Sequence, residues 1–333
     1  ATLAAANPNK AAKSAIAQKG PTLHIENFIG TIDVVQGGRE IVITDADGAP
    51  VSKTSNSVKI DAGYKINNAN CRQSKRAIKI DIGGWKMNKR GGGYKDIKDY
   101  PHMKISAPDN THLIIEKSVI FGDVTNIGSG DVHVRSCGDL NIGNVSNDFN
   151  LSISGSGDVE LGNVGGKLKT RVSGSGDASI GNAGITDIYV SGSGDLEIDN
   201  VARLDLHVSG SGDVEVGDIK GRAEIRASGS SDIELGRIDG GLDYEGSGSS
   251  DVEIDYINGN ATINTGGSGD VIIDNGRVDT LYIKASGASN VTYRGTSTSA
   301  EAYANGAADI SIKAPSGSLR THEGGAGNVN VDG

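Results

Sequence analysis

Apolar and polar residues alternate in short stretches along most of the chain. The stretch from Val214 to Val216 places apolar residues at every second position, which is typical of a β-strand with one buried face. A second alternation, at Leu204, Leu206 and Val208, belongs to a neighbouring stretch of the same kind. Between such stretches, segments like Gly162 to Val164 end on an apolar residue that we expect to point inward at a corner. The pattern predicts at least two strands in each repeat.

A tetrapeptide turn, Gly-Ser-Gly-Asp or a variant of it, sets the length of the repeat. From Asp158 onward its last residue recurs every 18 to 20 residues. Gly tolerates positive φ at such a turn, and Asp or Asn can accept hydrogen bonds from nearby backbone amides. We therefore predict an all-β fold, a parallel β-helix or β-solenoid with coils of 18–20 residues. The turns end at Asp131, Asp158, Asp177, Asp195, Asp213, Asp232, Asp251, Asp270, Asn290, Asp309 and Asn328.

The organisation of the chain follows from this repeat and from its composition. With 50 Gly, 3 Phe and 1 Trp in 333 residues, the chain lacks large core residues, which favours many thin stacked layers over one wide core. We expect a flexible N-terminal tail over 1–20 and an N-terminal β region over 21–130, with a basic Gly-rich loop at 83–99. That region is expected to continue into the regular solenoid over 131–333.

Charge is strongly segregated along the chain. The segment 59–104 has 12 Lys or Arg against 4 Asp, a net +8, although the whole chain carries −10. Its cations and aromatic rings suit a sugar or a polyanion, whereas a purely structural interpretation is a hairpin whose charge offsets an acidic rod. The acidic balance of the whole chain argues against nucleic acid as the partner. The candidate ligand-binding residues are Trp85, Lys86, Lys89, Arg90, Tyr94 and Tyr100.

Stacked coils would align the turn aspartates in an acidic ladder, beside a second ladder that contains Glu197 and Glu215. Ca²⁺ prefers six to eight oxygen ligands and would relieve the repulsion between such carboxylates. The known nonapeptide calcium repeat places its Asp one position differently, so turn capping with a solvated acidic face is the competing interpretation. Apart from Ca²⁺, no cofactor is expected. The candidate metal ligands are Asp158, Asp177, Asp195, Asp213, Asp232 and Asp251.

Two cysteines, Cys71 and Cys137, match neither a zinc cluster nor a redox pair, because those motifs need closely spaced cysteines. A single disulfide and two buried thiols both remain open. No apolar run is long enough for a transmembrane helix. The first residues, rich in Ala, Lys and Asn, resemble the tail left after signal-peptide cleavage or a linker, and export would favour the disulfide.

Nothing in the sequence indicates catalysis. The six histidines are scattered, with none paired at metal-ligand spacing. The Gly-Ser-Gly-Asp turn is followed by a strand, whereas a nucleophile elbow or a dinucleotide-binding loop is followed by a helix. We therefore expect a protein that is not an enzyme.

Three features together resemble a known family. They are the strands over Ile25 to Val34, the stretch Met103 to Pro108, and the iterated Ser-Gly-Ser-Gly-Asp-Val-Glu units. They resemble the autotransporter adhesin head GIN domain family over residues 21 to 333. The resemblance implies a bacterial β-solenoid that is secreted, periplasmic or on the cell surface, and adhesive. The long basic loop and the late turns at 287–290 and 306–309 depart from the family pattern.

The function expected from these observations is a non-enzymatic adhesin-like scaffold. It would present a repetitive face to a surface polysaccharide or a protein. The alternative is a carbohydrate-binding or lyase-like carbohydrate-active β-helix that uses the basic aromatic loop. Because the segment Asn328 to Gly333 resembles one more half-coil with no obvious cap, self-association through the solenoid ends is a further expectation.

Overall fold

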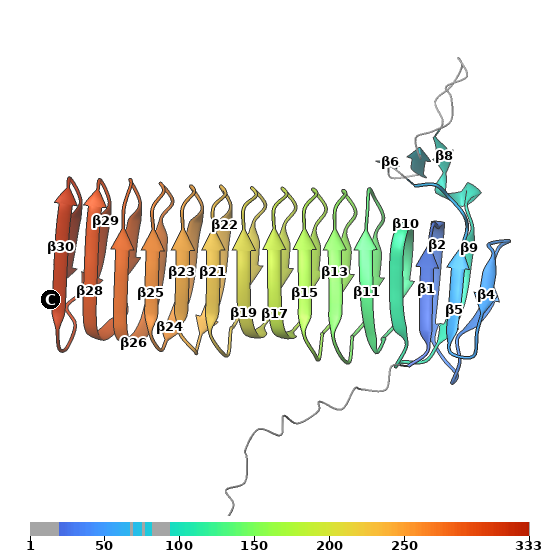
Figure 1. Cartoon of the computed structure of the whole chain (residues 1–333), viewed down its shortest axis with the longest axis horizontal. Coiled ribbons are helices and arrows are strands. Elements are labelled where there is room, and N and C mark those ends of the chain that lie inside the picture. Colours follow the sequence, from blue (N-terminus) through green and yellow to red (C-terminus); the bar gives the residue numbers. More distant parts are fainter. Residues whose placement is uncertain (1–19, 67–68, 75–76, 82–93, 333) are drawn as a thin grey trace, which may run out of the picture.

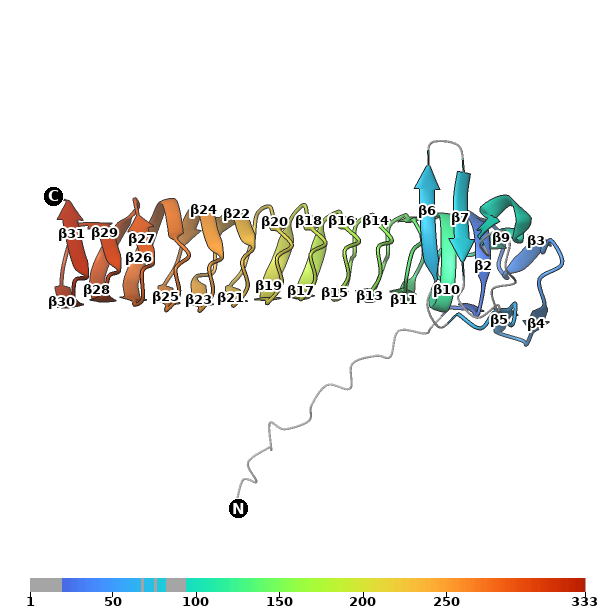
Figure 2. The same cartoon turned by 90° about the horizontal axis from the view of Figure 1, so that it is seen from above.

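The computed structural model describes residues 20–66, 69–74, 77–81 and 94–332. These residues form strands, with a single 3-10 turn, η1 (Ile97–Asp99). The strands stack in parallel into a long rod, shown from the side in Figure 1 and from above in Figure 2. The predicted all-β parallel solenoid is confirmed.

The rod has two long sides, and one of them, wall I, carries the strands that follow the turns. Neighbouring strands of wall I pair in parallel, as β18 and β20 do through Glu197 and Glu215. From the N-terminal to the C-terminal end, wall I consists of β9 (His102–Ala107), β2 (Ile29–Gln36), the second half of β10 (His112–Val124), β12 (Leu140–Ile142), β14 (Val159–Leu161), β16 (Ala178–Ile180), β18 (Leu196–Ile198), β20 (Val214–Val216), β22 (Asp232–Ile238), β24 (Asp251–Asn258), the first half of β26 (Val271–Ala285), β27 (Asn290–Tyr293), β29 (Asp309–Lys313) and β31 (Asn328–Asp332).

The opposite side, wall II, carries the second strand of each coil. Its pairs are also parallel, as in the match of Tyr189 with His207 between β17 and β19. In the same order, wall II consists of β5 (Ser57–Asp61), β1 (Thr22–Glu26), the first half of β10, β11 (Ser129–Val134), β13 (Phe149–Ile153), β15 (Leu168–Val172), β17 (Ala183–Val190), β19 (Val201–Val208), β21 (Ala223–Ala227), β23 (Leu242–Gly246), β25 (Ala261–Thr265), the second half of β26, β28 (Thr296–Gly306) and β30 (Leu319–Gly325).

The core lies between the two walls and runs along the rod. Each coil contributes alternate side chains from both strands, such as Val214 in wall I and Leu206 in wall II, and both are fully buried. At the corner between the strands, single residues such as Val164 and Ile219 point inward and form isolated parallel bridges with adjacent coils. The alternation and the inward corner residue were both predicted correctly.

The turn glycines follow a different rule from the one the sequence indicates. Positive φ is found at the late turns, with φ of 84° at Gly287, 76° at Gly306 and 73° at Gly325. Positive φ is absent at the regular turns from Gly155 to Gly269. The prediction that their glycines are needed for positive φ is therefore wrong at those turns. At Gly176, a Cβ would lie 2.1 Å from the carbonyl oxygen of Gly157 in the preceding coil. The regular turns need glycine because stacked coils bring their backbones too close for a side chain.

The N-terminal end of the rod is closed by strands that run against the parallel order. Strand β1 lies between β5 and β10, so the first strand of the described residues is inserted inside the stack. The two outermost strands then receive antiparallel partners: β3 (Val42–Asp45) pairs with β9, and β4 (Val51–Lys53) pairs with β5. These antiparallel strands cover an edge that the solenoid would otherwise leave open.

A separate hairpin projects from the rod near this end (Figure 2). It is a three-stranded antiparallel sheet of β6 (Asn70–Ser74), β7 (Ala77–Asp81) and β8 (Lys95–Asp96). Its base packs on a small second core that includes Ile80, Tyr100 and Phe121. Apolar residues on the outer side of β2 and β10 are thereby covered.

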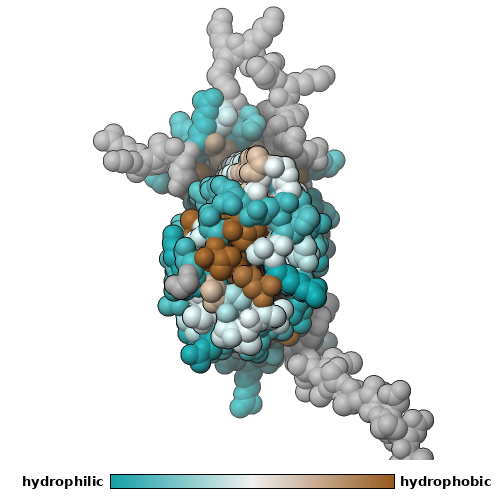
Figure 3. All heavy atoms as spheres, turned by 90° about the vertical axis from the view of Figure 1, so that its left-hand side faces the viewer, coloured by the Kyte–Doolittle hydropathy of each residue, from teal (hydrophilic) through white to brown (hydrophobic). Residues whose placement is uncertain are grey.

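The C-terminal end differs, because its last two strands pair on one side only within the described residues. β30 pairs with β28, and β31 pairs with β29. Looking at this end of the rod, Figure 3 shows a hydrophobic patch at the centre of the end face. Leu319 and Val331 are 40% and 36% exposed there.

Candidate functional site

The outer surface of wall I carries two parallel rows of carboxylates. The second residue of each short strand points outward between two buried residues, as Glu197 does between Leu196 and Ile198. Register pairing places Glu197, Glu215, Glu234 and Glu253 in one row. The turn aspartates form the adjacent row. A shallow groove of about 480 Å³ crosses successive coils here, and it is lined by residues of both rows from Asp158 to Glu234.

The aspartate row is built by hydrogen bonds between coils. Oδ1 of Asp158 accepts the backbone N–H of Asp177 at 3.0 Å, and Oδ1 of Asp177 accepts that of Asp195 at 2.9 Å. Asp195 and Asp213 continue the series at 2.9 Å, and Asp251 bonds to the N–H of Asp270 at 2.8 Å. Each of these aspartates therefore caps the amide of the following coil and keeps its second carboxylate oxygen available.

The carboxylates of these two rows are not neutralised by cations, although Arg294 pairs with Asp274 farther along wall I. Within the described part of the chain, no ion pair includes Glu160, Glu197, Glu215, Glu234 or Glu253, nor any turn aspartate from Asp158 to Asp270. Like charges in adjacent coils repel, so wall I has a strong negative potential along the rod. A cationic surface would be attracted to it.

Wall II differs, because several of its carboxylates form ion pairs with Lys or Arg. Lys167 Nζ lies 2.6 Å from Asp187 Oδ2, and Arg226 Nε lies 3.3 Å from Glu245 Oε2. The rings of Tyr189 and His207 stack in adjacent coils, with centroids 4.9 Å apart and planes within 5°. This stacked pair was not predicted from the sequence, although the two residues occupy the same position in consecutive repeats.

Asparagine side chains form a further ladder at the corner of the coils, which was not predicted from the sequence. Oδ1 of Asn144 accepts both the backbone and the side-chain N–H of Asn163, at 2.8 and 3.1 Å. Asn163 and Asn182 repeat the arrangement at 2.9 Å. The available signal was the recurring Gly-Asn dipeptide before the inward corner residue. This asparagine ladder contributes to stability and offers no obvious chemistry.

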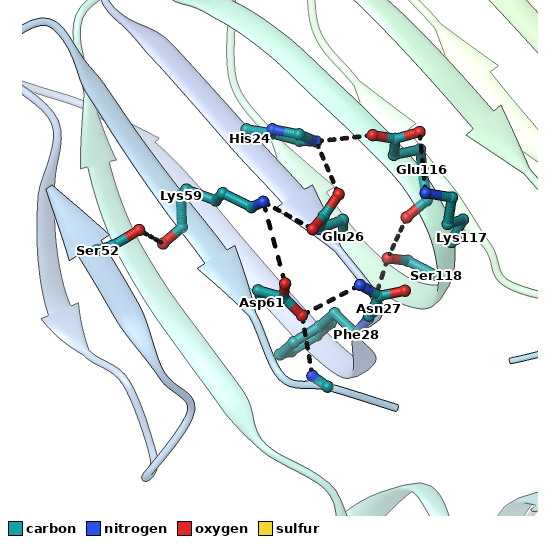
Figure 4. A network of polar contacts seen from close by, with 11 residues as sticks. His24, Glu26, Asn27, Phe28, Ser52, Lys59, Asp61, Glu116, Lys117 and Ser118 are labelled. Atoms are coloured by element: carbon teal, nitrogen blue, oxygen red, sulfur yellow. Dashed lines mark hydrogen bonds and ion pairs between the residues drawn. The ribbon is translucent and has the colours of Figure 1, made fainter. Parts of the chain in front are cut away.

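One group of side chains in the described residues converges closely enough to hold a metal ion. Ligand atoms of His24, Glu26 and Glu116 all lie within 4.8 Å of one another (Figure 4). His24 Nε2 is 3.0 Å from Glu116 Oε1 and 3.6 Å from Glu26 Oε2. One imidazole and two carboxylates are a donor set that Zn²⁺ accepts.

The surroundings of this group favour a charge network over a metal centre. Lys59 Nζ lies 2.7 Å from Glu26 Oε1, and Lys117 Nζ lies 3.9 Å from Glu116 Oε2. The hydrogen bond to Glu26 raises the pKa of Lys59. Burial opposes ionisation of Glu116, but its hydrogen bond with His24 and the charge of Lys117 outweigh burial and lower the pKa of Glu116. Each carboxylate thus already has its own cation, and the network joins β5, β1 and β10.

The residues predicted to bind a ligand on the basic loop are only partly described. Trp85, Lys86, Lys89 and Arg90 lie outside the described residues. Tyr94 is half-buried, with the guanidinium carbon of Arg72 4.5 Å from its ring centroid. Tyr100 is buried in the second core and packs edge-on against Tyr64, with centroids 5.8 Å apart. Its ring is therefore not open to a ligand.

The two cysteines tie this hairpin to the rod. Cys71 on β6 and Cys137, which follows β11, form a disulfide with their Cα atoms 6.1 Å apart. The bond spans 66 residues of sequence. It links the hairpin to the coil that precedes the first regular turn.

Within the described residues, no helix is long and apolar enough to cross a membrane.

Comparisons with known proteins give one match. No curated protein and no solved structure matches the chain. A family model does match, and its range runs from β9 into β22, across most of the acidic rows. The family resemblance is thereby confirmed for residues 103–236, which match the model described as "Putative auto-transporter adhesin, head GIN domain".

Proposed function

We propose that this protein is a non-enzymatic adhesin-like scaffold outside the cell, which presents wall I to a cationic, extended partner. The observation that carries the proposal is the pair of carboxylate rows that repeats from coil to coil without neutralising cations. A repeating surface suits a polymer or an elongated protein, because several equivalent contacts can form at once. The adhesin description of the matched family supports the scaffold role and the location.

A comparison of equal charge changes on the two walls tests this proposal. One variant carries Glu197→Gln, Glu215→Gln and Glu234→Gln on wall I. The control carries Glu224→Gln, Asp243→Asn and Glu245→Gln on wall II, so both variants lose three negative charges. Binding of chitosan oligosaccharide and of polylysine to the immobilised protein is measured over a range of salt concentrations, with dextran as the neutral polymer.

We expect the wall I variant to bind the cationic polymers more weakly and with a smaller salt dependence, because fewer charges are engaged. The wall II control should bind like the unmodified protein. Equal losses in both variants would show that only net charge matters. Absence of binding to either cationic polymer would contradict the proposed partner chemistry.

A second candidate function is ligand binding by the basic hairpin, as a carbohydrate-binding or carbohydrate-active protein. Tyr94 under Arg72 is the observation in its favour, since a ring beside a cation suits a sugar acid. A glycan array separates the two candidates. Binding that Tyr94→Ala or Trp85→Ala abolishes would support the hairpin, and release of product from a polysaccharide would establish an enzyme.

A further inference from the structure

Strand β15 on wall II presents two cations to solvent. Its residues Leu168, Thr170 and Val172 point inward and are buried, whereas Lys169 is half-buried and Arg171 is exposed on the outer face. Figure 1 shows β15 in the wall that faces the viewer, between β13 and β17. In the described part of the chain, no ion pair includes Lys169 or Arg171. The strand therefore carries two positive charges that no described carboxylate neutralises by direct contact.

The carboxylate that lies in register with these cations is already occupied. Asp187 on β17 lies opposite Lys169. Its Oδ2 is 2.6 Å from Lys167 Nζ, and this hydrogen bond raises the pKa of Lys167. The register partners of Arg171 on β13 and β17 are a serine and a tyrosine. The positive charge of the two β15 cations is therefore available to an anion from outside the protein.

Both cations converge on the ring of Tyr189. The guanidinium carbon of Arg171 is 4.9 Å from the ring centroid, and Lys169 Nζ is 6.0 Å from it. On the side of the next coil, the ring stacks on His207, with centroids 4.9 Å apart. A contact between a cation and a ring face orients the cation and leaves its charge and its N–H donors available. Tyr189 therefore holds the two cations in place before a ligand arrives, which lowers the side-chain entropy lost on binding.

We propose that this surface of β13, β15 and β17 binds an acidic polysaccharide through the carboxylate groups of its uronic acid residues. Arg171 can donate two N–H groups to one carboxylate, and Lys169 adds a second positive charge beside it. Ser152 and Tyr189 flank Arg171 in the row, and their hydroxyl groups can hydrogen-bond with sugar hydroxyls. Wall II lies on the opposite side of the rod from wall I (Figure 2), so this site goes beyond the proposed function and does not depend on it.

The architecture of wall II favours a polysaccharide over other polyanions. Strand β15 already pairs with β13 and β17, so it has no open edge on which an acidic peptide could add a strand. A peptide helix would need an apolar groove, whereas the outward residues of β15 are charged. A nucleic acid binds through many phosphates, and two cations are too few for it. A polysaccharide makes its contacts through carboxylate and hydroxyl groups, and this surface offers partners for both.

The negative charge of the protein limits the affinity and does not prevent binding. The carboxylate rows of wall I lie across the core, and packed sheets are about 10 Å apart. Ions at physiological salt screen charges over about 8 Å, so these rows act weakly on wall II. Among the nearer carboxylates, Asp187 is paired with Lys167, and Asp205 Oδ1 lies 3.1 Å from His207 Nε2. We therefore expect binding at physiological salt.

Fluorescence anisotropy with labelled oligogalacturonate and the full chain tests the proposal at physiological salt. Replacing both β15 cations, Lys169→Gln with Arg171→Gln, should weaken binding by at least about tenfold, because hydrogen bonds to charged groups are lost. The control is Arg277→Gln with Lys284→Gln on β26. These two cations are also exposed, and within the described residues they are in no ion pair and lie over no aromatic ring. The control has the same net charge as the β15 variant and should bind like the unmodified protein.

Three comparisons separate the ring and the sugar from charge in general. Tyr189→Leu keeps both cations but removes the ring that positions them, so it should weaken binding by about threefold. Methyl-esterified oligogalacturonate has the same sugar ring and no charge, and it should not bind. Polyglutamate carries its carboxylates on a peptide chain and should bind more weakly than oligogalacturonate.

Four outcomes would overturn the proposal. Absence of oligogalacturonate binding to the unmodified protein would exclude the ligand class. Equal losses in the two double variants would show that only net charge matters. Undiminished binding of the methyl ester would exclude the carboxylate contact, and equally tight binding of polyglutamate would indicate an acidic peptide as the occupant. Circular dichroism of each variant shows that its strands are intact. The wall I variants are measured with cationic polymers, so either proposal can fail without the other.

Discussion

Substitution of Asp195 separates the two roles that a turn aspartate has in this fold. Its Oδ1 accepts the N–H of Asp213 at 2.9 Å, and its charge lies in a row with those of Asp177 and Asp213. Asp195→Asn removes the charge and keeps an oxygen acceptor. Asp195→Ala removes both. The difference between Asn and Ala therefore measures the hydrogen bond, and the difference between Asp and Asn measures the charge.

The expected magnitudes follow from the geometry of the row. Charges in adjacent coils are about 4.8 Å apart, the usual spacing of paired strands. Two neighbours at that distance repel by about 1 kcal/mol in total in water at physiological salt. Asp195→Asn should stabilise the protein by roughly this amount. The hydrogen bond contributes about 1 kcal/mol, so Ala should be less stable than Asn by that much, which corresponds to about 2 °C in Tm.

Thermal unfolding by circular dichroism is the assay, on metal-stripped protein at low and high salt. The gain from Asn should shrink at high salt because ions screen the repulsion, while the gap between Asn and Ala should persist. Added Ca²⁺ provides the second comparison, since a native-state ligand raises Tm. The reasoning fails if Asn and Ala melt together. It also fails if Asn is less stable than the unmodified protein without metal, since the charge would then be stabilising.

Three further predictions concern the N-terminal region and the core. Because the pKa of Glu116 is lowered from 4.5 in the folded state, the ionised carboxylate stabilises the protein above that pH, and this contribution is lost as the pH falls below it. In Glu116→Gln, the free energy of unfolding measured with urea should therefore fall less steeply as the pH is lowered. Reduction of the Cys71–Cys137 disulfide, which closes a loop of 66 residues, should lower the free energy of unfolding by about 4 kcal/mol, measured by urea unfolding with and without reductant; an unchanged midpoint would contradict this. Burial, with the nearby charge of Asp251, raises the pKa of Tyr244 from 10 to about 12, so stability should fall between those pH values, and Tyr244→Phe should retain it in alkaline melting curves.

The regular part of the fold was predictable because each coil repeats one pattern. Period-two alternation gave the strands, and the recurring Asp gave the coil length. Inward corner residues such as Val164 were predicted from the same comparison of the repeats. The comparison of the repeats could not show why each turn position needs its particular residue. Gly176 could be assigned to positive φ or to close approach, and only the position of Gly157 in the preceding coil decides between them.

The N-terminal region was not predictable in the same way, because its strands leave the order of the sequence. Strand β1 pairs with β5 and β10, which follow it by 31 or more residues of chain, and no local pattern encodes such an insertion. The network of His24, Glu26 and Glu116 depends on this pairing. For that reason three residues that are unremarkable in the sequence form the closest group of potential ligands in the described structure.

The acidic rows were visible in the sequence, but their isolation from cations was not. Other coils of the same chain show that the fold does not require a carboxylate at these positions. In the glutamate row, Ser179 stands between Glu160 and Glu197, and Thr292 and Ser311 occupy the same row in later coils. Asn290 replaces the turn aspartate and still donates its backbone N–H to Asp270 at 2.8 Å.

Neutral residues therefore satisfy the coil geometry without repulsion, and yet the coils from Asp195 to Glu253 retain both carboxylate rows. Departures from the locally most stable choice are expected where a surface has a function. Wall II has the same parallel pairing of strands, and it pairs Arg226 with Glu245 and Lys167 with Asp187. Since ion pairs form on wall II, and Arg294 pairs with Asp274 on a later strand of wall I, the unpaired charge of the two carboxylate rows is more simply explained by a partner than by the fold.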